Sequence, residues 1–189
     1  MTAWQNDARW GSLMCGHGPG RIGDVGCVLS SLTEAANRFT PRNLNPATLN
    51  MVLQKVPGAF VDGTAAANPG DELVLPIACG QVGLECGESL LAPAGSSSLV
   101  DALKAALGDG GAFLRIDING DGKGDHTILA VRDIGHVIEC TDSAWPRQEG
   151  VAGGYAMISW DGLSAEVWWN KTFHTYRVVG VRAVRSSKQ

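Results

Sequence analysis

The hydrophobic pattern of the chain changes near residue 110, and this change constrains the fold more than any other feature. Before it, apolar residues recur at helical spacing, and we expect helices over residues 27–39, 46–55, 72–83 and 98–107. After it, five segments rich in β-branched and aromatic residues predict strands: AFLRIDI, HTILAV, HVIEC, YAMISW and FHTYRVVGVRAV. Helices followed by strands are typical of the α+β class, so we expect N-terminal helices packed on a C-terminal antiparallel sheet.

Length and charge limit the kinds of partner that such a chain can serve. Its 189 residues, 44% of them hydrophobic, fit a single domain over residues 1–189 with a core that needs no metal or disulfide. The net charge of −4 argues against nucleic acid or an anionic membrane as the main partner, because both bind basic surfaces. We see no signal peptide and no apolar run of membrane-spanning length, so we expect a cytoplasmic protein.

The five cysteines fit a reducing compartment, because an odd number without a signal peptide favours free thiols. A bridge between Cys79 and Cys86 could form, although their spacing does not require one. Cys27 differs from the others by its setting in RIGDVGCVLSSLTEAANRF, where it begins a strongly amphipathic helix. Helix dipoles and first-turn amides lower the pKa of such a thiol and favour its nucleophilic form, and Gly23 and Gly26 leave room for a substrate. Alternatively, Cys27 is a small buried apolar residue.

A thiol nucleophile needs a base and a group that orients the base, and two residues fit these roles. His126 begins the predicted strand HTILAV, beside a turn-rich loop, where it could face a cleft. Asp142 ends the next strand, which we expect to pair with HTILAV, and it could fix the His126 tautomer. Trp145 could cover this pair from water. Alternatively, His126 is a solvated or backbone-bonded strand-end histidine, and Asp142 caps a turn.

The order of several segments resembles the C39-like cysteine peptidases, which have a papain-like fold. The segments are WQNDARWG, IGDVGCVLSSLTEAANRF, NPATLN, SLVDALKAALGDGGAFLRIDI, DHTILAVRD and TDSAWP, between about residues 4 and 146. The resemblance implies that Cys27 is the nucleophile, His126 the general base and Asp142 its orienting residue. It also implies that the Gln5 amide donates to the oxyanion, beside the backbone N–H of Cys27.

The resemblance further implies hydrolysis of amide bonds through a thioester between Cys27 and the substrate acyl group. The expected substrate is a peptide. A peptidoglycan endopeptidase or amidase is the alternative enzyme, possible in a phage virion, and the six tryptophans are compatible with it without selecting it. The non-enzymatic alternative is a papain-fold binding or structural module that has lost activity. The sequence indicates neither the cleavage preference nor the oligomeric state.

The loop DINGDGKGD is a second candidate site. It matches the first nine positions of an EF-hand-type calcium loop, with Gly122 at the bend and candidate ligand positions at Asp117, Asn119, Asp121, Lys123 and Asp125. The twelfth position is Ile128 instead of a bidentate Glu, and the flanking segments are predicted strands. The alternative is a polar hairpin turn built from Asn-Gly and Asp-Gly. If calcium binds there, it would stabilise the entrance to the strand that carries His126.

Overall fold

The computed structural model describes residues 3–61, 70, 72–144, 155–169 and 172–187. Its helices are α1 (Ile22–Val25), α2 (Cys27–Phe39), α3 (Pro46–Leu53), α4 (Leu75–Gln81) and α5 (Ser97–Asp109). The helix predicted over residues 27–39 is confirmed at both ends, and the other three predicted helices are confirmed within a few residues. None of the described helices has the length and apolar character needed to cross a bilayer.

The strands form an antiparallel barrel with two extra strands. They are β1 (Leu84–Cys86), β2 (Leu90–Leu91), β3 (Gly111–Asp117), β4 (His126–Asp133), β5 (Val137–Thr141), β6 (Tyr155–Ser159), β7 (Ser164–Trp169) and β8 (Thr172–Ser186). Following the pairings from β3 through β4, β5, β6, β7 and β8 returns to β3, so these six strands close. The short strands β1 and β2 pair with the C-terminal half of β8.

This closure shows that the predicted fold class, an α+β papain-like fold with N-terminal helices on an antiparallel sheet, is wrong. The chain is mostly sheet, and the sheet is a barrel rather than an open layer. Two irregularities in register, between Arg115 and Ile116 and between Ala130 and Arg132, bend the strands. The 15 residues of β8 then pair with β3 and, at their beginning, with β7, which joins the two ends of the sheet.

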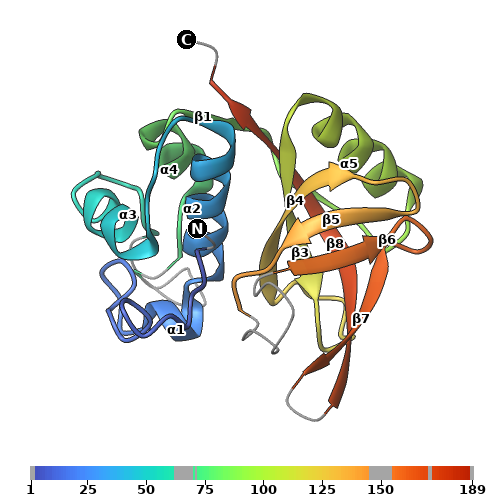
Figure 1. Ribbon diagram of the computed structural model, residues 1–189, viewed down its shortest axis with the longest axis horizontal. Helices are drawn as coiled ribbons and strands as arrows, with labels where there is room; N and C mark the ends of the chain where they lie inside the picture. Colours follow the sequence, from blue (N-terminus) through green and yellow to red (C-terminus); the bar gives the residue numbers. More distant parts are fainter. Residues whose placement is uncertain (1–2, 62–69, 71, 145–154, 170–171, 188–189) are drawn as a thin grey trace.

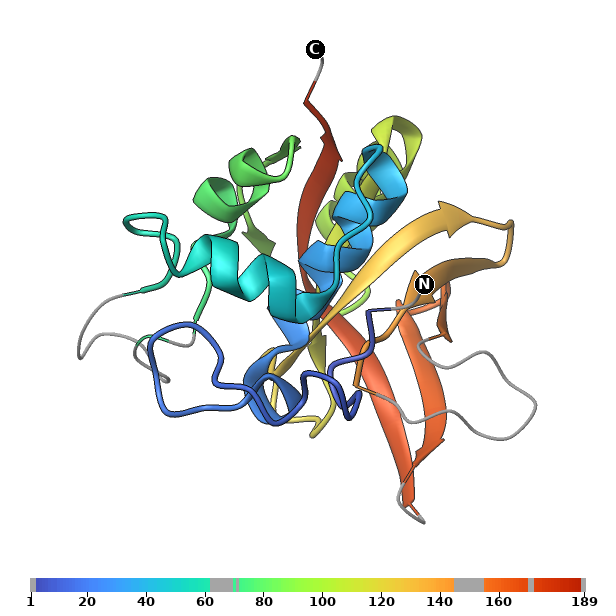
Figure 2. The same ribbon diagram turned by 60° about the vertical axis from the view of Figure 1, so that its left-hand side comes forward.

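The helices α1 to α4 gather beside the barrel, with α2 between them and the sheet, while α5 lies on the barrel itself (Figures 1 and 2). Strand β4 connects the two hydrophobic clusters, because both of its faces are buried. Leu129 and Val131 pack in the cluster that contains α2, whereas Ile128 and Ala130 pack in the barrel cluster with α5. The beginning of β4 therefore lies where the helices meet the barrel.

Two local expectations about helix starts and strands need correction. Helix α5 begins at Ser97, one residue before the predicted start at 98, and the side chain of its N-cap residue Ser96 makes no capping bond. The strand β7 was not predicted, because SAEVWW mixes polar and aromatic residues without a clear period of two. By contrast, the predicted pairing of HTILAV with HVIEC is confirmed as β4 with β5.

Candidate functional site

Cys27 is the first residue of the 13-residue helix α2, and its side chain is half-buried. The preceding Gly26 has no side chain to cap the helix, so first-turn amides remain available to the sulfur. One turn further along, the Ser31 hydroxyl donates to the carbonyl oxygen of Thr127 at 3.1 Å. This bond docks α2 on the beginning of β4 and brings Cys27 beside His126, the first residue of that strand.

His126 and Asp142 lie together at the end of the barrel, as the sequence predicted. The His126 Nε2 and the Asp142 Oδ1 are 2.8 Å apart, and the two side chains are 7% and 0% exposed. The backbone N–H of Ala144 also donates to Oδ1 at 2.9 Å, and the Tyr176 hydroxyl donates to Oδ2 at 2.5 Å. Because Nε2 binds the carboxylate, the Nδ1 atom of His126 is left to meet the thiol.

The electrostatics of this group favour a thiolate beside an imidazolium. Burial raises the pKa of the Cys27 thiol, but the hydrogen bond and charge of His126 and backbone hydrogen bonds from Thr127 and Val28 bring it below its ordinary value. Burial lowers the pKa of His126, but the charge and hydrogen bond of Asp142, followed by those of Cys27, raise it to about 10. The two groups therefore stabilise each other in their charged forms near neutral pH.

Gln5 is 5% exposed and joins the segment before Cys27 to the segment after Asp142. Its Nε2 donates to the carbonyl oxygen of Gly23 at 2.9 Å, and its backbone N–H donates to the carbonyl oxygen of Ser143 at 2.9 Å. The Ser143 hydroxyl donates to Oε1 at 3.4 Å. The second N–H of the Gln5 amide has the chemistry of an oxyanion donor. No observation tests this role, which therefore stays a prediction.

Neighbouring atoms of the chain itself lie close to the two glycines before Cys27. A Cβ atom on Gly23 would lie 2.9 Å from the Asn6 side-chain oxygen, and one on Gly26 would lie 2.4 Å from the backbone oxygen of Ile22. The absence of side chains thus lets the N-terminal segment and α1 approach α2 closely. This is a different reason for the glycines from the room for substrate that the sequence suggested.

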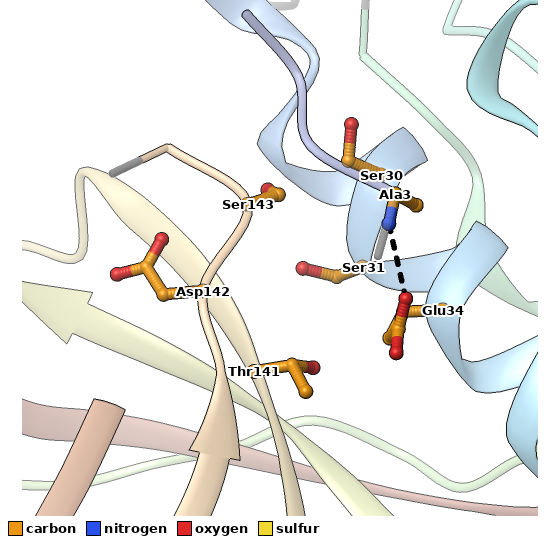
Figure 3. Close-up of a pocket in the computed structure, with 7 residues that line it drawn as sticks. All are labelled: Ala3, Ser30, Ser31, Glu34, Thr141, Asp142 and Ser143. Atoms are coloured by element: carbon orange, nitrogen blue, oxygen red, sulfur yellow. Dashed lines mark hydrogen bonds between the residues drawn. The ribbon is translucent and has the colours of Figure 1, made fainter. Parts of the chain in front are cut away.

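A small pocket lies behind Asp142, between α2 and the end of β5 (Figure 3). Six of its seven lining residues are of polar type, and the seven are Ala3, Ser30, Ser31, Glu34, Thr141, Asp142 and Ser143. The N-terminal segment closes one side, where the backbone N–H of Ala3 donates to Glu34 at 3.1 Å. The pocket therefore adjoins the carboxylate side of the candidate site, and Cys27 is not in its lining.

The loop predicted to bind calcium is organised around one carboxylate. Asp117 is 2% exposed and accepts the backbone N–H groups of Gly120, Asp121 and Gly122 at 2.7, 3.2 and 2.9 Å. The Asn119 amide donates to Asp125, and the Lys123 ammonium lies 4.0 Å from Asp121. Among the described residues, no group of three or more His, Cys, Asp or Glu side chains could hold a metal ion. Calcium binding here stays a prediction, and the reaction that we propose for Cys27 does not require it.

Cys79 and Cys86 lie close together and are free thiols. Cys79 is buried in α4, and Cys86 is half-buried in β1, where Arg182 Nη1 lies 4.0 Å from its sulfur. The hydrogen bond with Cys79 lowers the pKa of Cys86 to about 6, with help from Arg182 and against the effect of burial. Any labelling experiment on Cys27 must therefore resolve Cys86 separately.

Tyr176 is the member of the site that the sequence analysis missed. It lies on β8, is 0% exposed, and comes 34 residues after Asp142, to which it donates. Alternation along FHTYRVVGVRAV predicts that Tyr176 and Val178 share a face, but it does not predict the carboxylate that the tyrosine meets. Trp145, predicted to cover His126 and Asp142, is outside the described residues.

Comparison with known proteins gives no independent assignment. No protein-family model matches the chain, and no curated protein matches it either.

Proposed function

We propose that the protein is a cysteine-dependent hydrolase that cleaves amide bonds, with peptides as the expected substrates. The observation that carries the proposal is the continuous interaction from the half-buried Cys27 sulfur through His126 to the buried Asp142. Nucleophile, base and orienting group are the three parts that thiol catalysis needs. The resemblance to C39-like cysteine peptidases supports the same three assignments, although the chain does not have the papain-like layout.

The reaction starts from the ion pair, in which the proton of Cys27 is already on His126 Nδ1. The thiolate attacks the substrate carbonyl carbon, and the oxyanion accepts hydrogen bonds from the N–H groups at the start of α2 and from Gln5. The C–N bond then breaks, and the imidazolium gives its proton to the leaving amine, which leaves a thioester on Cys27. His126 next takes a proton from water, the hydroxide attacks the thioester, and breakage of the C–S bond releases the acid and regenerates the thiolate–imidazolium pair.

Throughout the cycle, Asp142 holds the His126 ring and stabilises its charged form, because Oδ1 accepts Nε2 at 2.8 Å. The site needs no separate acid, since the same imidazole serves both steps. The raised pKa of His126 also means that the free enzyme rests as the ion pair and attacks without a prior proton transfer to solvent.

The first test is site-resolved alkylation. The intact protein is treated with iodoacetamide at pH 6, and peptide mapping by mass spectrometry gives a separate rate for each cysteine. We expect fast labelling of Cys27 that is lost in His126→Ala, because the thiolate then loses its counter-ion. The matched control is His136→Ala, which removes an exposed histidine from the β4–β5 turn and should leave the Cys27 rate unchanged. Peptide mapping is required because Cys86 has a low pKa of its own.

The second test identifies the bond that is cleaved. A peptide library is incubated with the protein and with Cys27→Ala, and mass spectrometry detects new termini that only the thiol-containing protein produces. Loss of turbidity by purified cell walls, again dependent on Cys27, would instead identify a peptidoglycan hydrolase. Slow, uniform labelling of the cysteines and no Cys27-dependent cleavage in either assay would contradict a hydrolase and favour a binding module.

A further inference from the structure

The two oxygens of the Asp142 carboxylate have separate partners, and both the carboxylate and the tyrosine that binds it are 0% exposed. Oδ1 accepts His126 Nε2 at 2.8 Å and the backbone N–H of Ala144 at 2.9 Å. Oδ2 accepts the hydroxyl of Tyr176 at 2.5 Å. The side-chain torsion of an aspartate carboxylate is intrinsically broad, so its orientation is set by these donors.

Tyr176 reaches Asp142 because the barrel closes. It lies near the beginning of β8, opposite Ala165 of β7, while Asp142 directly follows the end of β5 on the other side of the ring. Burial and the charge of Asp142 raise the pKa of Tyr176, so its phenol stays protonated and remains a hydrogen-bond donor throughout the pH range of catalysis. The simpler interpretation is a core tyrosine that satisfies its own hydroxyl with the nearest acceptor.

We propose that Tyr176 is a positioning residue, whose hydroxyl holds Asp142 so that Oδ1 faces the Nε2 atom of His126. This inference rests on the proposed hydrolase function and adds a fourth residue to its machinery, from the C-terminal strand. Without the hydroxyl, Oδ2 is a buried charged acceptor with its side-chain donor removed, and such a group rotates toward other donors. The rotation weakens the stabilisation of the imidazolium, and the thiolate at Cys27 loses its counter-ion in turn.

The test is Tyr176→Phe, which keeps the ring and removes only the donor. The readout is the pH profile of Cys27 alkylation by iodoacetamide, resolved by peptide mapping. We expect the apparent pKa of Cys27 to rise and its rate at pH 6 to fall about tenfold, since one pKa unit corresponds to a tenfold change in thiolate. In the Asp142→Asn background, Tyr176→Phe should add no further change, because the tyrosine acts through the carboxylate.

The matched control is Val178→Ala, which alters a fully buried hydrocarbon side chain two residues along the same strand. It should lower the unfolding temperature but keep the wild-type profile of Cys27. If Tyr176→Phe behaves in the same way, the role of Tyr176 is structural and the proposal is overturned. An additive effect of Tyr176→Phe in the Asp142→Asn background would overturn it too.

Should Tyr176→Phe fail to fold, the chain offers a milder variant, since Tyr155 and Tyr176 are its two tyrosines. Biosynthetic replacement by 3-fluorotyrosine in the Tyr155→Phe protein changes the acidity of one donor and keeps its hydroxyl. The Cys27 profile must then shift, and an unchanged profile overturns the proposal. Failure of the hydrolase function itself is recognised separately, because the wild-type Cys27 would then titrate as an ordinary thiol.

Discussion

The Asp142→Asn substitution tests the electrostatic basis of the candidate site, because it removes the charge of Asp142 and keeps nearly the same shape. With 2.8 Å between His126 Nε2 and Asp142 Oδ1, Coulomb's law at an effective dielectric constant of about 20 gives about 6 kcal/mol. That energy corresponds to about four pKa units. We therefore expect the pKa of His126 to fall from about 10 to near or below its ordinary value of 6.5.

A neutral His126 no longer stabilises the thiolate, so the pKa of Cys27 should return toward its ordinary value of 9.0 or above, since burial raises it. At pH 7 a thiol of that pKa is about 1% ionised. A thiolate of higher pKa is also intrinsically more nucleophilic, which offsets part of this loss. We expect alkylation of Cys27 to be about tenfold slower than in the wild type at pH 7 and at least as fast at pH 10.

The crossing of the two rate profiles is the sharp feature of this prediction. Iodoacetamide rates between pH 5 and 10, resolved by peptide mapping, measure it directly, and Cys86 in the same digest is the internal control. Profiles that coincide would refute the argument, because the charge of Asp142 would then have no effect on Cys27. A rate that is lower by the same factor at every pH would also refute it, since that result indicates changed access to the sulfur and not a changed pKa.

The same pair makes stability depend on pH, and the sign follows from the raised pKa of His126. Its stabilising contribution is fully present below 6.5, the unfolded value, and is lost as the pH rises through about 10. The upper limit is about 5 kcal/mol, which is 1.36 kcal/mol for each of the pKa units between the two values. Urea unfolding of Cys27→Ala should show this slope, and Cys27→Ala/Asp142→Asn should lack it.

Three shorter predictions concern the neighbouring features. Gln5→Ala should lower turnover about 100-fold without changing the alkylation profile of Cys27, because an oxyanion donor acts only on the substrate; a parallel loss of alkylation would contradict that role. Asp117→Ala should lower the free energy of unfolding, measured with urea in EDTA, by about 2–3 kcal/mol, since three backbone N–H groups lose their acceptor. If the substitution lowers this free energy only when calcium is present, the loop is instead a calcium site. Cys79→Ala should raise the pKa of Cys86 above about 6 and slow the labelling of Cys86 at pH 7. An unchanged rate would show that the hydrogen bond from Cys79 does not lower this pKa.

The parts of the site that could be predicted depend on the pattern of one segment or on the pairing of two consecutive strands. The apolar stripe of RIGDVGCVLSSLTEAANRF was sufficient to start a helix at Cys27, because helical periodicity is a local signal. His126 and Asp142 could be paired in advance because a short turn joins β4 to β5, which makes these strands antiparallel neighbours. The start of β4 and the end of β5 then lie at the same end of the sheet, and the side chains of His126 and Asp142 meet there.

The contacts that were not predicted join segments far apart in the sequence. Gln5 bonds to Ser143 across 138 residues, and Tyr176 bonds to Asp142 across 34. The contact of Tyr176 depends on where distant strands pair, and the pairing of β8 with β3 and β7 is not encoded in the pattern of any one segment. A shift of one residue in that register would turn Tyr176 to the opposite face. Local patterns therefore locate the reactive residues but not the groups that hold them.

The closed barrel also changes which part of the chain the proposed chemistry depends on. The resemblance to cysteine peptidases ends near residue 146, so Cys27, His126 and Asp142 are within it and β7 and β8 are not. Yet β8 closes the ring beside β3, and its Tyr176 is the side-chain donor to the second oxygen of Asp142. A chain that kept the three reactive residues and lost β8 would leave the second oxygen of this buried carboxylate without its tyrosine donor, so the C-terminal strand belongs to the candidate site as much as the helix that carries the thiol.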